Sequence, residues 1–203
     1  MPELNQDFKL DILKEVGNIG AGNATTSLSQ LLNYQRVDMY VPEVDLCPLD
    51  EIPDLLGGAE KPVQGVFIKA PGDVSFYTVF LMGEESAHSL VTNLTGREQS
   101  LDGEMGRSVL LEVGNIVTAA YLNALSYMTD LTFLPEPPQL AVDMAGAILG
   151  TVLAEANVAE DYILVLKTAF STDSGDIDGN FLIIPDIDAL DTVVKLLIDG
   201  VAK

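Results

Sequence analysis

A five-residue run, Glu-Val-Gly-Asn-Ile, occurs twice in the chain, at positions 97 residues apart. In each copy a carboxylate stands three residues before a carboxamide, Glu15 before Asn18 and Glu112 before Asn115. Residues three apart are neighbours on one face of a helix. Each copy therefore predicts a small polar patch that joins a charged group to a neutral amide.

These two groups suit the positioning of a reactant better than the exchange of protons. A side-chain amide is a poor acid or base, but its one acceptor and two donors can hold a water molecule. Phosphoryl transfer depends mostly on geometry and electrostatics, and an amide that orients the attacking water is a recurring device in it. The carboxylate can pair with a lysine of a partner protein and fix its docking register. The alternative is that both pairs are polar surface residues of a duplicated scaffold.

Other catalytic chemistries find few suitable residues. His88 is the only histidine, so a serine–histidine triad or a histidine-rich metal site would have to be built around it. We interpret His88 as a surface or boundary residue and Cys47, the only cysteine, as a small apolar residue. Residues 176–180 begin like a calcium loop but lack the glycine and the glutamate that later positions require, so we interpret them as a polar turn. The sequence predicts no metal or cofactor site in this chain.

The similarity between the two halves extends beyond the five-residue run. At the same offset Leu28 matches Leu125, so the likeness covers the length of a helix. We predict a single domain over residues 1–203, built from two internal repeats, 7–97 and 103–200, that are related by a pseudo-twofold axis.

Hydrophobic periodicity predicts the order α-β-β-β-α in each half. The expected fold class is α+β: one αβ sandwich with a mainly antiparallel sheet and two long helices that carry the motifs. Residues 7–33 are expected to form one long helix or two helices in tandem, because the pattern is kinked or broken near Gly20 and Gly22. The predicted elements of the first half are helix 7–33, strands 37–46, 63–70 and 74–82, and helix 84–94 ending at Gly96. Those of the second half are helix 103–128, strands 131–135 and 161–170, a polar turn at 171–179, strand 180–184, and helix 188–198 ending at Gly200.

One segment breaks the expected symmetry. Where the first half has a loop over residues 48–62, the second has residues 139–157, whose Ala, Leu, Ile and Val content predicts a helix. Small residues between Ala145 and Gly150 would allow another backbone to approach it closely. Two interpretations remain open: a helix buried in the core, and a docking surface for a partner protein.

Composition argues against several classes of partner. The 203 residues include 10 Lys and Arg against 31 Asp and Glu, a net charge of −21, which repels nucleic acid and anionic membrane surfaces. The longest uncharged apolar stretch, residues 144–154, is shorter than the about 20 residues that cross a bilayer. The N-terminus lacks the basic start and apolar run of a signal peptide. We expect a cytoplasmic protein that binds neither nucleic acid nor membrane.

Each motif extends in both directions along the chain. Asp11 and Ser108 stand four residues before the glutamates, and Pro42 and Pro138 follow the asparagines. This pattern closely resembles the D/S-x3-E-x2-N-x22-P signature of the CheC, CheX and FliY family of chemotaxis phosphatases. The second copy fits the signature fully. The first has one extra residue before its proline, which we place in the loop at residues 33–36.

The resemblance covers nearly the whole chain and is closest to the CheC members, because CheX-like members carry one motif and FliY-like members add a C-terminal domain. It implies hydrolysis of the aspartyl phosphate on the response regulator CheY, with magnesium and the phosphoaspartate supplied by CheY. In that role Asn18 and Asn115 would position the hydrolytic water, and Glu15 and Glu112 would contact a lysine of CheY.

Family members with both motifs commonly also bind the receptor deamidase CheD, for which the predicted helix 139–157 is our candidate surface. Two other functions stay open: a CheD-binding adaptor with weak hydrolysis, and a structural component of the flagellar motor without turnover. Gly20 and Gly22 follow the first motif where Val117 and Ala119 follow the second, and we expect the second site to be the more active.

Overall fold

The computed structural model of the chain describes residues 6–31, 37–55, 57–156, 162–172, 175–185 and 189–201. Within these residues, each half has a long helix, three strands and a shorter final helix, with a further helix between its first two strands. The elements are α1 (Gln6–Leu31), β1 (Val37–Pro48), α2 (Ile52–Leu55), β2 (Pro62–Ala70), β3 (Phe76–Gly83), α3 (Glu84–Thr95), α4 (Glu104–Thr129), β4 (Gln139–Met144), α5 (Ala145–Ala156), β5 (Tyr162–Thr172), β6 (Gly175–Pro185) and α6 (Ala189–Val201).

The six strands form one antiparallel sheet in the order β1-β5-β6-β3-β2-β4. Each strand has a counterpart in the other half: β1 corresponds to β4, β2 to β5 and β3 to β6. Counterparts lie at equal distances from the two edges of the sheet, so the order is symmetric about its centre. Phe80 pairs with Phe181 at the centre of the sheet, between the two middle strands. A pseudo-twofold axis near this pair would produce such an order, and we propose that the two halves are copies of one unit.

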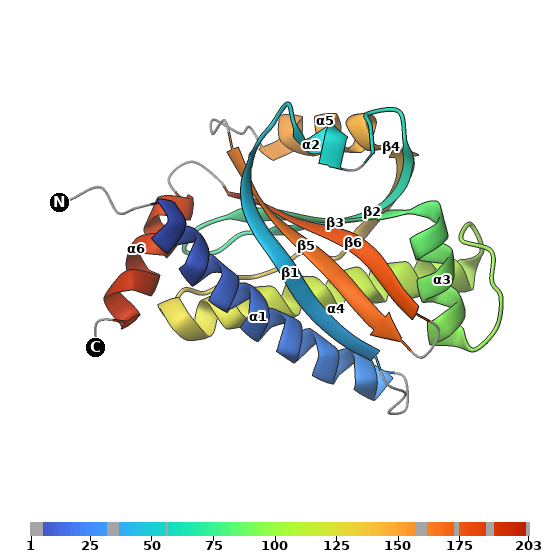
Figure 1. Cartoon of the computed structure of the whole chain (residues 1–203), viewed down its shortest axis with the longest axis horizontal. Coiled ribbons are helices and arrows are strands. Elements are labelled where there is room, and N and C mark those ends of the chain that lie inside the picture. Colours follow the sequence, from blue (N-terminus) through green and yellow to red (C-terminus); the bar gives the residue numbers. More distant parts are fainter. Residues whose placement is uncertain are drawn as a thin grey trace.

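Helices cover both faces of the sheet (Figure 1). The buried side chains of α1, α3, α4 and α6 share one core with one face, and those of α2 and α5 share a second, smaller core with the other. β3 lies between these cores and is buried at seven of its eight residues, from Phe76 to Met82. Burial on both faces explains why its sequence is a continuous apolar run without alternation.

Several predicted elements are confirmed. The β2–β3 hairpin and the two long helices lie where hydrophobic periodicity placed them. α3 ends at Gly96, whose φ of 68° is the left-handed conformation that glycine adopts easily at a helix C-terminus. α1 continues through Gly20 and Gly22, so the alternative of two helices in tandem is wrong.

The prediction for residues 131–157 is wrong in part. Residues 131–135 make only an isolated bridge, Phe133 with Gly72, and the strand is β4. Three prolines between residues 135 and 138 lack the N–H group that a regular ladder needs, which delays the strand. α5 then begins directly after β4 with no turn residue between them, so apolar content alone did not mark the boundary.

Three further predictions differ from the structure. The expected polar turn at 171–179 is mostly strand, because β5 runs to Thr172 and β6 begins at Gly175. Ile177 and Gly179 are buried while Asp178 between them is exposed, as in a strand with one face on the core. α6 also continues through the predicted end at residue 200, and the predicted loop 48–62 contains α2.

The glycine in each motif faces the sheet. A Cβ atom at Gly114 would lie 2.4 Å from Cγ1 of Val66 on β2, and one at Gly17 would lie 3.1 Å from Cδ2 of Leu166 on β5. Val66 and Leu166 are counterparts, because each pairs with the central phenylalanine of the neighbouring strand. The missing side chain thus brings the motif helix close to the sheet.

The two long helices run antiparallel and cross at Gly20 and Tyr121 (Figure 1). A Cβ atom at Gly20 would lie 2.6 Å from Cδ1 of Tyr121. The Tyr121 ring stacks on Phe181 with 4.7 Å between ring centroids. Burial raises the pKa of the Tyr121 phenol, so this group stays neutral inside the core. Gly20 is therefore explained by the ring that it accommodates.

The contact at Gly114 yields a stability prediction. We expect Gly114→Ala to lower the free energy of unfolding by about 1–3 kcal/mol, because the new methyl group would overlap the buried Val66. Gly22→Ala is the matched control, because a Cβ atom there meets nothing within 4 Å. The higher helix propensity of alanine should raise the free energy of unfolding of this variant by about 0.5–1 kcal/mol. Urea unfolding measures both, and equal shifts in the two variants would contradict the packing explanation.

A small group of charged residues lies on β1 and β5. Lys167 forms an ion pair with Glu43, which lowers the pKa of that carboxylate and raises the pKa of the lysine. Asp45 lies beside them, and its partial burial, followed by its hydrogen bond to Glu43, raises its pKa. A carboxyl group whose pKa is raised on folding destabilises the folded state at every pH where it is ionised.

We therefore expect Asp45→Asn to stabilise the protein near neutral pH. The gain should be at most about 0.5 kcal/mol, because the site is largely open to solvent and screened. It should disappear as the pH falls below about 4, where Asp45 is protonated in both folded and unfolded chains. Thermal unfolding at pH 7 and pH 3.5 tests this expectation, and a variant less stable than the original chain at pH 7 would contradict it.

Candidate functional site

Both carboxylate–amide pairs lie on the outer sides of the two long helices. Glu15 and Asn18 are exposed on α1; on α4, Glu112 is exposed and Asn115 is half-buried. None of these four side chains makes a hydrogen bond or an ion pair with another described residue. All four are therefore available to solvent and to a docked protein.

The helix itself sets the distance within each pair. Three residues span about 4.5 Å along a helix axis, and side chains at this spacing have Cβ atoms about 5–6 Å apart. The residues between the two polar ones point inward, and Val16 and Val113 are 4% and 0% exposed. Asp11 and Ser108, one turn earlier, are also exposed, as their spacing predicts.

The structure brings together the members of each pair but keeps the two pairs apart. On each helix the motif precedes the crossing residue, Gly20 on α1 and Tyr121 on α4. Because the helices are antiparallel, these two segments extend from the crossing in opposite directions (Figure 1). The chain therefore presents two separate patches instead of one combined site.

The prolines of the signature occupy equivalent places relative to the sheet. Val44 and Leu140 are counterparts, since they pair with Leu166 and Val66 respectively. Each follows its signature proline, Pro42 or Pro138, by two residues. The extra residue of the first motif thus precedes its proline, although the predicted position at 33–36 is outside the described residues.

A groove that the sequence did not reveal adjoins the second motif. Ser108 and Glu112 line an open groove of about 340 Å³ between α3 and α4, together with Arg97 and Met105. Met105 is 48% exposed, unusual for so large an apolar side chain. Its position one turn before Ser108 was the available signal. The second patch thus combines a carboxylate with an apolar surface and a cation.

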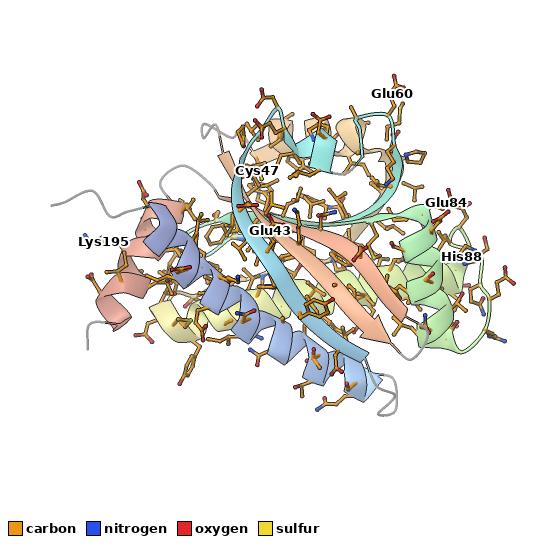
Figure 2. All side chains as sticks on the ribbon, viewed as in Figure 1. Glu43, Cys47, Glu60, Glu84, His88 and Lys195 are labelled. Carbon is orange, nitrogen blue, oxygen red and sulfur yellow. The ribbon has the colours of Figure 1, made fainter. Side chains whose placement is uncertain are left out.

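The remaining chemical groups do not compete with the motifs. His88 projects from the outer side of α3, beside Glu84, and Cys47 lies on β1 (Figure 2). Burial raises the pKa of the Cys47 thiol, which keeps it protonated and a poor nucleophile. In the part of the chain that the structure describes, no three His, Cys, Asp or Glu residues lie close enough to hold a metal ion.

α4 is apolar as well as long. By length and composition it could cross a bilayer, but 56% of its most apolar window is buried inside the fold. Its buried side chains pack on the sheet and on α1. This is the pattern of a core helix in a globular domain.

Comparison with known proteins places these features in a family. The model of the CheC-like family matches residues 8–45 and again residues 105–142. Each match runs from a motif helix into β1 or β4, and the two matches have the same offset as the two motifs. This agreement supports the interpretation of a duplicated unit.

Individual relatives give the same result. The chain is 34% identical over 199 residues to the CheY-P phosphatase CheC of Bacillus subtilis, with 95% of each protein covered. It is 25% identical over 185 residues to the flagellar motor switch phosphatase FliY of that species, covering 87% of this chain and 46% of FliY. The crystal structure of Thermotoga maritima FliY has the same fold, with a TM-score of 0.75 at 15% identity over 97% of this chain and 99% of that one. With such identity to CheC over almost its whole length, the chain belongs to the CheC-like family.

Proposed function

We propose that this chain hydrolyses the aspartyl phosphate of CheY. The observation that carries the proposal is the pair of exposed carboxylate–amide patches, Glu15 with Asn18 and Glu112 with Asn115, on two helices held firmly on a sheet. They occur in a chain 34% identical to a CheY-P phosphatase. The magnesium ion and the phosphoaspartate belong to CheY, and this chain contributes no cofactor.

The asparagines act by placing water. The amide of Asn18 or Asn115 holds one water molecule in line with the phosphorus atom of the docked phosphoaspartate. The water oxygen forms a bond to phosphorus as the bond from phosphorus to the aspartate oxygen breaks. Inorganic phosphate leaves with the protons of the water, and the CheY carboxylate is regenerated. Because the amide gains and loses no proton, its contribution is the alignment of the reactants.

The glutamates act on docking. Glu15 and Glu112 each stand one turn from the amide that they serve, and each pairs with a lysine of CheY. A charge-assisted contact so close to the amide fixes the register of the two proteins. The contact of each motif glycine with the sheet holds the helix in place when CheY docks.

Removal of the two amides tests the water-positioning role. We expect Asn115→Ala alone to lower the rate of phosphate release by about twofold or more and Asn18→Ala alone to lower it by less, because one patch remains in each variant and the second patch is expected to be the more active. In the double variant the rate of phosphate release should fall about 100-fold or more, which is the typical effect of removing a positioned polar group from a reaction site. Release of inorganic phosphate from phosphorylated CheY measures these rates.

Two exposed asparagines outside the motifs serve as matched controls. Asn23→Ala on α1 and Asn123→Ala on α4 remove the same group from the same helices and should leave the rate within about twofold. Unaltered turnover in the double motif variant would refute the role of the asparagines. A chain that folds but never accelerates phosphate release would instead favour the adaptor or motor-component alternatives.

We also propose that CheD docks on the outer side of α5. Part of the predicted docking surface on α5 faces the interior. Ala145 is buried, and a Cβ atom at Gly146 would lie 3.1 Å from Cβ of Ala59. Ala147 and Gly150 are exposed, and a Cβ atom at Gly150 would meet nothing within 4 Å. These two small residues permit close approach of another backbone, which supports the docking interpretation for this side of the helix.

Lysine substitutions at the exposed positions test this second contact. We expect Ala147→Lys with Gly150→Lys to weaken CheD binding about tenfold or more, because the long side chains block close approach, while phosphate release stays unchanged. Gln30→Lys on α1 adds the same charge at an exposed site elsewhere and should have no effect. Isothermal titration calorimetry measures the affinity for CheD, and an unchanged affinity in the double lysine variant would contradict the docking of CheD on α5. Ala145 is unsuitable for this test because a charge there would be buried.

A further inference from the structure

β4 leaves one side of its backbone unpaired at the edge of the sheet. The N–H of Ala145 donates to the carbonyl of Lys61 at 2.9 Å, which fixes the alternation of the antiparallel ladder between β4 and β2. Counting back in steps of two, residues 143, 141 and 139 direct their backbone groups toward β2. Leu140 and Val142 therefore direct their N–H and C=O groups outward.

A groove runs along this edge. β4 and α5 enclose about 370 Å³ between them, lined by Ala141 of β4 and by Ala147 and Ile148 of α5. Asp143 and Glu155 also line it, and its described lining contains no basic residue. A strand added beside β4 would place alternate side chains in this small, acidic groove.

The other edge of the sheet is better protected than the segment of β4 from Gln139 to Val142. Since Val44 and Leu140 are counterparts, Glu43 and Asp45 on β1 correspond to Gln139 and Ala141 on β4. β1 thus carries two carboxylates and a register shift where β4 has neutral side chains and a regular register. Charges and bulges on edge strands are the usual protection against unwanted pairing.

The opposite side of β4 is apolar. Val142 and Met144 are 46% and 48% exposed, and their outward edge is not covered by any described element. The Met144 N–H is already occupied by the Asp143 carboxylate at 2.7 Å, so the open part of the edge ends there. An added strand would cover apolar surface on both sides of the sheet.

We propose that the edge of β4 binds an extended, cationic segment of a partner protein as an additional strand. Backbone hydrogen bonds to Leu140 and Val142 would supply the pairing, small apolar side chains would enter the groove, and basic ones would reach Asp143 and Glu155. A second copy of this chain is a poor occupant, because each copy carries a net charge of −21. The inference uses neither motif, so its failure would leave the phosphatase proposal intact.

The test uses the full chain and an end-blocked, fluorescein-labelled nine-residue peptide of alternating lysine and valine. We expect the peptide to bind and to slow amide hydrogen exchange at Leu140 and Val142. Val142→Pro removes an outward N–H without touching the ladder to β2 and should weaken binding at least tenfold. Val142→Thr keeps that N–H and should bind within threefold. Phosphate release should stay unchanged in both variants.

A second variant makes the test independent of proline. Ala141→Lys puts a cation in the lining of the groove and should also weaken binding at least tenfold. Absence of binding, or equal affinity for the Val142→Pro and original chains, would overturn the proposal. If a glutamate–valine peptide binds as tightly as the lysine–valine peptide, the inference that the partner segment is cationic is overturned. Analytical sedimentation of the free chain gives one more outcome. If the chain forms a dimer that Val142→Pro abolishes, the edge binds a second copy, and the proposal of a cationic partner is overturned.

Discussion

The contact between the motif glycine and a branched side chain of the sheet determines where the polar pairs lie. At Gly114 the helix approaches Val66 so closely that no side chain fits between them, and Gly17 meets Leu166 in the equivalent place. A glycine inside a helix costs about 1 kcal/mol relative to alanine, and here close packing on the sheet offsets that cost. With this side of the helix against the sheet, the flanking carboxylate and amide must face solvent.

The same architecture separates the surfaces that we assign to different partners. The motif helices lie on one face of the sheet and α5 lies on the other, so the contacts that we propose with CheY and CheD would not compete for one area (Figure 1). The helix crossing at Gly20 and Tyr121 also separates the two motifs from each other. Their surroundings differ, because Arg97 and Met105 border the second patch. The two proposed sites thus differ in a few surface residues.

Much of the fold could be read from the sequence, and the errors have physical causes. The motif helices and the hairpin were predicted because periodicity and turn residues mark them clearly. β4 was misplaced because α5 follows it without a breaker, and the start of β6 was taken for a turn because Gly179 is there to accommodate the ring of Phe80. The outward position of the motif pairs followed from helical spacing alone. The groove beside Glu112 was not predicted, since it depends on how α3 packs beside α4, and the spacing of residues along one helix does not determine that packing.

The strand order also bears on how the protein is made. Neither half can complete its own part of the sheet, because β1 pairs with β5 of the second half and β4 pairs with β2 of the first. Val37 at the start of β1 finds its partner only at Thr172. A nascent chain emerging from the ribosome must therefore hold β1 unpaired until the last third of the protein has been translated, and such long-range closure slows folding. Genetic separation of the two halves would yield fragments that each lack an outer strand and need the other to fold.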